Sequence, residues 1–324
     1  MAEEFLCEVK NLKKYFIAQK DLLGHAVKTV KACDDVTFSM KRGETLGVVG
    51  ESGCGKTTLG RTLLKLEEPT DGRIIFDGTD ITEFSYREMR PLRKHMQIVF
   101  QDPYASINPR YTILDCVREP LDVFKIGDPK DREKIVLDLL EYTGIPKAYA
   151  YRYPHELSGG QRQRVVIARA IISNPSLVVC DEAVSALDVS VRAQVLNLMR
   201  DIQRDRGVSY LFISHDISVV RYLSDRVLVM YLGKVMEEGR MHDVLDRPMH
   251  PYTKILLSAV PVPDVHAENK RILLEGDVPS PVNPPSGCRF RTRCPYAREC
   301  CQQEQTLTDT GGGHLVACAR CGEL

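Results

Sequence analysis

The sequence predicts an α/β fold with a mostly parallel sheet, a helical insertion and a cysteine-rich C-terminal tail. Three observations lead to this prediction. Short apolar runs of strand length alternate with helical patterns as far as Gly239, which is typical of parallel sheets covered by helices. Strand patterns fade between Asp102 and Leu157, and six of the eleven cysteines lie after Gly287.

The strands are predicted from apolar runs and the helices from apolar spacing. The predicted strands are Thr45–Val49, Gln97–Phe100, Leu177–Cys180, Tyr210–Ile213 and Val227–Tyr231. The spacing of apolar residues predicts one helical face from Val191, Val195, Leu198 and Ile202, and another from Leu59, Leu63 and Leu66. Asp131–Tyr142 is predicted to be a helix of the insertion. The segment after Val260 is rich in proline and predicts an extended, wrapping chain.

The charge balance and the apolar content narrow the class of protein. Lys and Arg together number 44, as do Asp and Glu, whereas a general nucleic-acid binder has a basic excess. The N-terminus has two early glutamates and no apolar run, so we expect no secretory signal. Since no stretch approaches the ~20 apolar residues of a membrane-spanning helix, we expect a cytoplasmic protein that acts on membranes through partners.

The segment Gly50–Thr58 reads GESGCGKTT and fits the phosphate-binding pattern G-x-x-x-x-G-K-S/T. It follows a predicted strand and precedes a predicted helix, as that pattern requires. Lys56 would bring charge to the terminal phosphates, and Thr57 would offer a hydroxyl to Mg²⁺. The candidate residues of this loop are Gly50, Ser52, Gly53, Cys54, Gly55, Lys56, Thr57 and Thr58.

Two carboxylates end the predicted strand LVVCDE, at the edge of the sheet where ligands bind in open α/β folds. Asp181 would hold Mg²⁺ through water, and Glu182 would polarise the attacking water. A strand that merely ends in solvated acids is the alternative, and the phosphate loop elsewhere in the chain argues against it.

The third motif is LSGGQ at Leu157–Gln161, where Ser158, Gly159, Gly160 and Gln161 open a helix and form a second anion site. With this motif the chain resembles ABC transporter ATPases, and more closely the second ATPase subunits of oligopeptide and dipeptide importers. The resemblance covers essentially the whole chain. Its further matches are VFQDPYASINP, which contains Gln101, SALDVSVRAQVLNLM from Ser185, SHD from Ser214, HPYT from His250, and GCRFRTRCPYA from Gly287.

The resemblance implies a P-loop ATPase domain over residues 1–259, with a helical subdomain at about 102–165, followed by an extension over 260–324. It also implies individual roles. Tyr15 would stack on adenine, unless it is an ordinary half-buried aromatic residue. Gln101 would contact Mg²⁺ and the attacking water, Asp188 would cross a dimer interface, and His215 would contact the γ-phosphate. One departure is visible, because Ala183 stands where this branch usually has proline after the catalytic glutamate.

The resemblance further implies that two such domains close head to tail around two ATP molecules. The expected partners are a second ATPase subunit in a heterodimer or homodimer, two transmembrane permease subunits and, indirectly, an extracellular solute-binding protein. The expected location is the cytoplasmic face of the plasma (inner) membrane. Peptides are the expected cargo, with nickel, a glycoside or an opine as alternatives. A soluble ABC ATPase acting on ribosomes or DNA fits less well, since the chain has one P-loop, one LSGGQ motif and no heptad tract.

The cysteines of the tail suggest a metal site, because a cytosolic chain keeps isolated thiols reduced. Cys288, Cys294, Cys301 and Cys318 form C-x5-C-x6-C-x16-C, whereas paired zinc motifs usually use C-x2-C. Iron–sulfur clusters accept more varied spacing. The tail resembles dipeptide-importer tails that carry a 4Fe–4S cluster, and this resemblance selects Cys301 over Cys300. Zn²⁺ and unliganded thiols are the alternatives.

Overall fold

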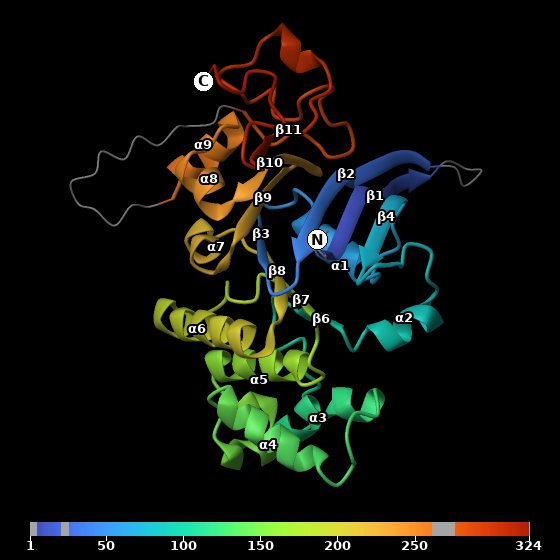
Figure 1. Cartoon of the computed structure of the whole chain (residues 1–324), viewed down its shortest axis with the longest axis vertical. Helices are drawn as coiled ribbons and strands as arrows, with labels where there is room; N and C mark the ends of the chain where they lie inside the picture. Colours follow the sequence, from blue (N-terminus) through green and yellow to red (C-terminus); the bar gives the residue numbers. More distant parts are fainter. Residues whose placement is uncertain (1–4, 21–25, 261–275, 324) are drawn as a thin grey trace, which may run out of the picture. The chain divides into compact units, whose positions relative to one another are not determined.

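The computed structural model describes residues 5–20, 26–260 and 276–323, which group into two compact units. The first unit consists chiefly of Glu83–Ile213. The second consists of Cys7–Met40, Leu46–Thr82 and the described part of Ser214–Leu324. Figure 1 labels the α-helices and the longer strands of both units. The described part of the proline-rich segment begins at residue 276, so the prediction for 261–275 lies outside the described residues.

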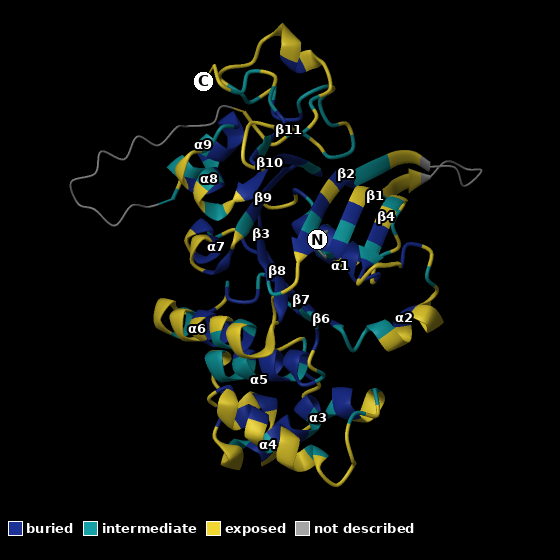
Figure 2. Cartoon of the chain, viewed as in Figure 1, coloured by how far each residue is buried: buried dark blue, intermediate teal, exposed yellow. Residues whose placement is uncertain are grey.

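The first unit contains three parallel strands in the order β6 (Met96–Val99), β7 (Leu177–Asp181) and β8 (Ser209–Ile213). Every residue of β7 and β8 is buried, as the dark blue strands of Figure 2 show. Strands buried on both faces have apolar sequences, and for this reason β7 and β8 were predicted to within a residue. The half-buried β6 was also predicted to within a residue. α6 (Val189–Arg206) buries Val195, Leu198 and Ile202, which confirms the predicted apolar face.

The remainder of the first unit is helical. α3 (Ile113–Val123) packs against α4 (Arg132–Tyr142) and α5 (Gly159–Ile171). No strand occurs between residues 102 and 165, all of which the structure describes, so this stretch is helical as the sequence predicts. The remaining elements of this unit are α2 (Tyr86–Leu92) and the 3-10 helices η1 (Lys147–Tyr151) and η2 (Pro154–Glu156).

The second unit contains β3 (Thr45–Val49) beside the parallel strand β9 (Arg226–Tyr231), and β10 (Lys234–Arg240) antiparallel to β9. Two short strands of the tail, β12 (Leu315–Val316) and β11 (Thr308–Asp309), extend this sheet beyond β10. The tail therefore joins the sheet by backbone pairing. The helices of this unit are α1 (Lys56–Leu63), α7 (Ile217–Leu223), α8 (Met241–Asp246), α9 (Pro251–Ser258) and the 3-10 helix η3 (Glu299–Gln302).

A four-stranded antiparallel sheet in the second unit was not predicted. Its order is β2 (Ala26–Lys41), β1 (Phe5–Lys20), β4 (Asp71–Phe76) and β5 (Thr79–Asp80). Val36, Phe38 and Met40 are buried in β2 and alternate with more exposed residues. Such alternation is typical of a sheet with one face toward the core, whereas the prediction relied on continuous apolar runs. The prediction of a mostly parallel sheet therefore holds for the strands that the sequence predicted, which are β3, β6, β7, β8 and β9, and not for this antiparallel sheet.

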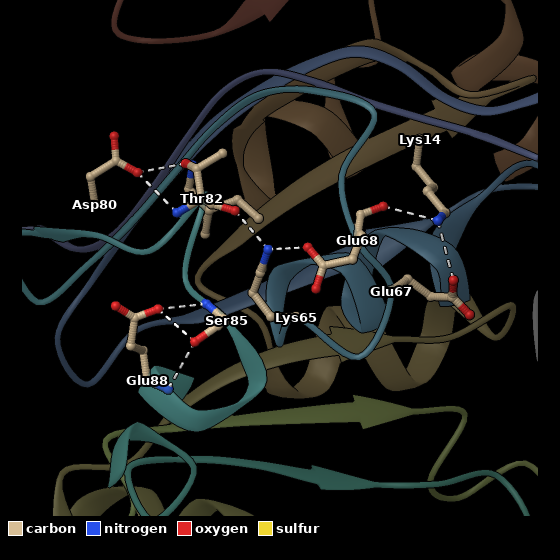
Figure 3. Close-up of polar contacts among 9 residues, drawn as sticks. Lys14, Lys65, Glu67, Glu68, Asp80, Thr82, Ser85 and Glu88 are labelled. Atoms are coloured by element: carbon tan, nitrogen blue, oxygen red, sulfur yellow. Dashed lines mark hydrogen bonds and ion pairs between the residues drawn. The ribbon is translucent and has the colours of Figure 1, made fainter. Parts of the chain in front are cut away.

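The end of α1 is tied down by polar contacts, and one predicted helical residue lies beyond it. Leu66 is 43% exposed, and α1 ends three residues before it. In Figure 3 the buried Lys65 donates from Nζ to the carbonyl oxygen of Thr82 at 2.6 Å and pairs with the carboxylate of Glu68. Lys14 of β1 donates to the carbonyl oxygen of Glu68 at 2.9 Å. These contacts fix the end of α1 that is remote from its glycine loop.

Candidate functional site

The predicted phosphate loop lies between β3 and α1, as its motif requires. Among the described residues, no side chain caps the N-terminus of α1 at Lys56. Gly55 has a φ of 107°, and a Cβ atom there would lie 2.0 Å from the carbonyl oxygen of Ala32. Gly50 has a φ of 152°, and its Cβ would lie 2.2 Å from the carbonyl oxygen of Met230. Only glycine fits at these two turns, and the uncapped helix N-terminus is suited to binding an anion.

Lys56 supplies the positive charge of this loop. Its buried Nζ donates to the carbonyl oxygens of Gly50 at 2.9 Å and Glu51 at 3.0 Å. An ammonium group held by the loop's own carbonyls can exchange these bonds for stronger ones to phosphate oxygens. Of the other predicted loop residues, Ser52, Gly53 and Thr57 are exposed, Thr58 is half-buried and Cys54 is buried. Burial raises the pKa of the Cys54 thiol, against an opposing effect of Lys56.

The two predicted carboxylates follow one another at the end of β7. Asp181 is 5% exposed, and Glu182 has a φ of 51°. Left-handed backbone at such a residue costs about 1–3 kcal/mol and is concentrated at functional sites. The Glu182 N–H donates to the carbonyl oxygen of Ile213 at 3.0 Å, and the Ser185 N–H donates to that of Glu182 at 3.1 Å. Gln101 Nε2 donates to the Glu182 carboxylate at 2.8 Å, so the structure brings these two predicted residues together.

The departure at Ala183 leaves this turn intact. Ala183 is buried, with 2% of its surface exposed. The backbone bonds that close the turn belong to Glu182 and Ser185. A proline at residue 183 would therefore stiffen a turn that is already held by hydrogen bonds.

The LSGGQ motif forms the N-terminus of α5. Ser158 is the N-cap residue: its hydroxyl accepts from the Gln161 N–H at 3.3 Å, and the Gln161 carboxamide accepts from the Ser158 N–H at 3.0 Å. The two glycines differ in their surroundings. A Cβ at Gly160 would lie 2.3 Å from Val191, whereas one at Gly159 would meet no described atom within 4 Å. Gly160 is thus required for packing against α6, and Gly159 leaves the start of α5 accessible to a ligand.

Asp188 lies close to this motif, because Val191 of the same helix packs on Gly160. Its carboxylate caps α6 by accepting from the Val191 N–H at 2.9 Å and the Ser190 hydroxyl at 2.8 Å. The Val191 N–H and then the Ser190 hydroxyl hold the pKa of Asp188 below its usual range. The exposed carboxylate is therefore an anion fixed at the helix N-terminus, and its predicted role across an interface is not tested by these contacts.

His215 is exposed and lies two residues after the end of β8. The N–H of its neighbour Ser214 donates to the carbonyl oxygen of Val48 at 3.2 Å. Val48 belongs to β3, the strand that leads into the phosphate loop. Asp216 caps α7 by accepting from the Ser218 N–H at 3.0 Å. The backbone next to His215 is thereby tied to the strand that leads into the loop, and its phosphate contact stays a prediction.

Tyr15 is half-buried on β1, and its hydroxyl is hydrogen-bonded to the Asp34 carboxylate. Burial and this bond raise the pKa of Tyr15 well above its ordinary value. The Lys31 ammonium lies 5.5 Å from the centroid of the ring. Tyr15 also lines a cavity of about 900 Å³ together with Asp34, with Lys234, and with Arg289 and other residues of the tail. Its ring is fixed in orientation, and its stacking on adenine is not tested by these contacts.

Three of the four predicted cysteine ligands share one local feature. The backbone of Phe290, Tyr296 and Arg320, in each case two residues further along the chain, opposes the burial that raises the pKa of Cys288, Cys294 and Cys318. Burial raises the pKa of Cys288 to about 11, and the thiols of Cys301, Cys318 and Cys294 add to this effect. Cys301 is buried, whereas Cys300 is exposed. However, the structure holds no group of three or more His, Cys, Asp or Glu side chains placed to bind a metal ion in its described part. The predicted metal centre is therefore not shown.

Sequence reasoning missed two arginines of the tail. Arg293 forms an ion pair with Glu51 of the phosphate loop, and Arg289 forms one with Asp34, the partner of Tyr15. Both lie within the segment GCRFRTRCPYA, for which the sequence predicted no contact of either arginine. Their partners are distant in sequence, and the tail carried no signal for either contact.

Among the described residues, no helix is both long enough and apolar enough to cross a membrane. A family model described as "ABC transporter" matches residues 33–185, and one described as "Oligopeptide/dipeptide transporter, C-terminal region" matches residues 236–301.

Individual relatives match over most of the chain. The oligopeptide transport ATP-binding protein AppF of Bacillus subtilis is 50% identical over 320 residues, which cover 98% of this chain and 97% of AppF. Among solved structures, the dimeric ATP-binding cassette MJ0796 bound to ADP and Pi has a TM-score of 0.65 and 28% identity, covering 72% of this chain and 98% of its own. Clostridium perfringens cbiO1, part of the ABC transporter complex cbiONQ, has the same TM-score and identity. The match covers 76% of this chain and 92% of cbiO1.

Proposed function

The chain belongs to the ATP-binding subunits of ABC transporters, in the oligopeptide and dipeptide branch, and we propose that it hydrolyses ATP to drive peptide uptake. The observation that carries this proposal is the hydrogen bond between Gln101 and Glu182. In an ATPase this pair would hold the attacking water. Full-length similarity to an oligopeptide transport protein supports peptides as the cargo.

Hydrolysis of ATP requires the phosphates to be held and the attacking water to be oriented. We assign the phosphates to the N–H groups of the glycine loop and to Lys56, which would release its bonds to the loop carbonyls. Glu182 orients and polarises the water, and the amide of Gln101 keeps the carboxylate in place. His215 contacts the γ-phosphate, and Tyr15 stacks on the adenine ring.

Mg²⁺ accompanies ATP, and the chain offers suitable oxygen ligands for it. Thr57 is exposed in the first turn of α1, and Asp181 ends β7 as a buried carboxylate. Hydroxyl, carboxylate and amide oxygens are the ligands that Mg²⁺ prefers, so Thr57, Asp181 and Gln101 would hold it. When bound, the ion neutralises charge on the β- and γ-phosphates.

We further propose that each ATP is shared between two ATPase subunits, with the LSGGQ motif of one subunit facing the ATP of the other. The open surroundings of Gly159 at the start of α5 support this arrangement. So does the dimeric state of the related cassette MJ0796. Dimer closure would then couple hydrolysis to movement of the permease, limited by the difference in ATP affinity between open and closed states.

The proposed assembly contains a second ATPase subunit, as a heterodimer or homodimer, and two permease subunits at the cytoplasmic face of the plasma (inner) membrane. An extracellular solute-binding protein would deliver the peptide. Affinity purification of the tagged chain from detergent-solubilised membranes tests this proposal. Mass spectrometry should identify permeases and a second ATPase in stoichiometric amounts, whereas recovery of the chain alone or with ribosomes would contradict it.

We propose the domain division at residue 259 and retain the 4Fe–4S cluster as a proposal for the extension. Its support is the burial of Cys301 and the nearness of Cys301, Cys318 and Cys294 to Cys288, whose pKa these three thiols raise. Four thiolates are the ligand set that a 4Fe–4S cluster takes. A cluster held by these four thiols would stabilise a segment with few apolar residues.

A further inference from the structure

Two arginines of the extension reach the parts of the second unit that are proposed to bind ATP. Both lie in the short loop between Cys288 and Cys294. Arg293 contacts the phosphate loop, and Arg289 contacts the support of Tyr15. Their side chains are nearly enclosed, with 8% and 6% exposed. Burial of a guanidinium is costly unless it is paired, so these contacts fix where the loop sits.

Arg293 is paired with the only acidic side chain of the phosphate loop, Glu51. One Nη atom of Arg293 lies 2.9 Å and 3.1 Å from the two carboxylate oxygens of Glu51. It also donates to the Tyr231 hydroxyl at 3.3 Å. The backbone of Glu51 is held as well, because its N–H donates to the Tyr252 hydroxyl at 2.8 Å. The carbonyl oxygen of Glu51 accepts from Lys56. Glu51 therefore contacts both Arg293 and the cation that is proposed to bind phosphate.

The charge of Glu51 gives this pairing a direct consequence for ATP. A carboxylate within a loop that binds phosphates repels them unless a cation offsets it. Arg293 supplies that cation from the extension. Without it, the remaining charge of Glu51 would oppose triphosphate binding, and the loop would lose a side-chain anchor.

The loop that carries the arginines is itself anchored between them. Phe290 is fully buried, 5.4 Å from the ring of Tyr231 and 5.3 Å from that of Tyr252. These two tyrosines are the ones whose hydroxyls contact Arg293 and the Glu51 N–H. At the base of the loop the Cys288 N–H donates to the carbonyl oxygen of Cys301 at 3.0 Å. The position of the loop is therefore set by packing as well as by charge.

Arg289 contacts the residue that supports Tyr15, the side chain proposed to stack on the adenine of ATP. Its guanidinium pairs with Asp34, and it donates to the carbonyl oxygen of Leu232 at 3.5 Å. The same Asp34 carboxylate is hydrogen-bonded to the Tyr15 hydroxyl. Arg289 thereby holds the acceptor that fixes the orientation of the Tyr15 ring.

We propose that Arg293 and Arg289 are positioning residues through which the C-terminal extension holds the phosphate loop and the adenine-stacking tyrosine ready for ATP. Arg293 acts on the triphosphate by offsetting Glu51, and Arg289 acts on the base through Asp34 and Tyr15. The inference rests on the proposed ATP site. It adds that the extension controls nucleotide affinity by ion pairing.

The test measures binding of Mg-AMP-PNP, which is not hydrolysed, and of inorganic tripolyphosphate to the full chain by titration calorimetry. Arg293→Ala should weaken both ligands by about tenfold, a typical coupling between sites. Arg289→Ala should weaken AMP-PNP but leave tripolyphosphate unchanged, because that ligand has no base. Arg291→Ala is the matched control, since Arg291 lies in the same loop and bonds to Ser286. It should leave both affinities unchanged.

A second variant separates ion pairing from loss of structure. Adding Glu51→Gln to Arg293→Ala removes the unpaired carboxylate and should restore most of the lost affinity. Arg293→Lys keeps the positive charge and should retain most of the wild-type affinity. Unchanged binding in Arg293→Ala would overturn the inference. So would a loss that Glu51→Gln does not relieve, because the arginine would then serve only the structure of the tail. Failure of the wild-type chain to bind AMP-PNP would instead refute the proposed ATP site.

Discussion

The side-chain amide of Gln101 donates a hydrogen bond of 2.8 Å to the carboxylate of Glu182. The two residues are separated by 81 positions in the chain, and the first follows β6 while the second follows the neighbouring parallel strand β7. Parallel neighbours end at the same edge of a sheet, so the fold places the amide next to the carboxylate. The bond orients the carboxylate that is proposed to face the attacking water.

This relationship predicts the effect of Gln101→Ala. The carboxylate of Glu182 would lose its orienting donor, and kcat for ATP hydrolysis should fall by up to about 100-fold, because misplacement of a catalytic group has effects of that size. The KM for ATP should change little. Steady-state ATPase assays test this, with Gln194→Ala as the control, since Gln194 bonds to Arg164 on α5. A raised KM with unchanged kcat would contradict the assigned role.

The proposed sharing of ATP between two subunits predicts complementation between two inactive variants. Lys56→Ala removes the cation proposed to bind phosphate, and Ser158→Arg blocks the N-terminus of α5, so each homodimer should lose hydrolysis. A mixed dimer would keep one site in which both residues are intact. Mixing the purified variants should therefore recover part of the activity. Mixtures that form dimers but stay inactive would argue against shared sites.

His250 predicts a pH dependence of stability. It is fully buried, its Nδ1 accepts from the Tyr252 N–H at 3.0 Å, and burial lowers its pKa from 6.5 to about 3. Between these values the unfolded chain binds a proton that the folded chain does not, so the free energy of unfolding falls as the pH falls from 6.5 toward 3. The slope from one such group is at most about 1.4 kcal/mol per pH unit.

His250→Asn keeps an acceptor for the Tyr252 N–H and removes the titration. Urea unfolding at pH 7.5, 5.5 and 4.5 should show that the variant loses less stability than the wild type over this range. Parallel losses in the two proteins would mean that His250 is not the group that titrates.

The extension predicts different outcomes for two adjacent cysteines. Cys301 is buried near Cys288, whereas Cys300 is exposed. Protein purified without oxygen should be brown and contain about four irons per chain. Cys301→Ser should lose the iron and the colour, and Cys300→Ser should keep both. A colourless anaerobic preparation with about one zinc per chain would refute the cluster and favour the zinc alternative.

The parts of the site that sequence predicted are those whose chemistry lies within a short segment. The glycine loop, the Asp181–Glu182 pair and the LSGGQ motif are each local, and the apolar runs of β3 and β7 lead directly into the first two. The antiparallel strands β1 and β2 escaped because their buried residues alternate with exposed ones. The pairing of Arg293 with Glu51 escaped because 242 positions separate the two residues, and neither periodicity nor spacing connects them.

The central claim is that this chain drives peptide import by hydrolysing ATP, with Glu182 as the catalytic carboxylate. The most direct test measures ATP hydrolysis by the complete transporter. The complex captured through this chain would be reconstituted in liposomes with its solute-binding protein and a dipeptide. Wild-type complex should show dipeptide-stimulated ATP hydrolysis, and Glu182→Gln should bind ATP yet hydrolyse it at least about 100-fold more slowly. Hydrolysis near the wild-type rate in Glu182→Gln would contradict the account.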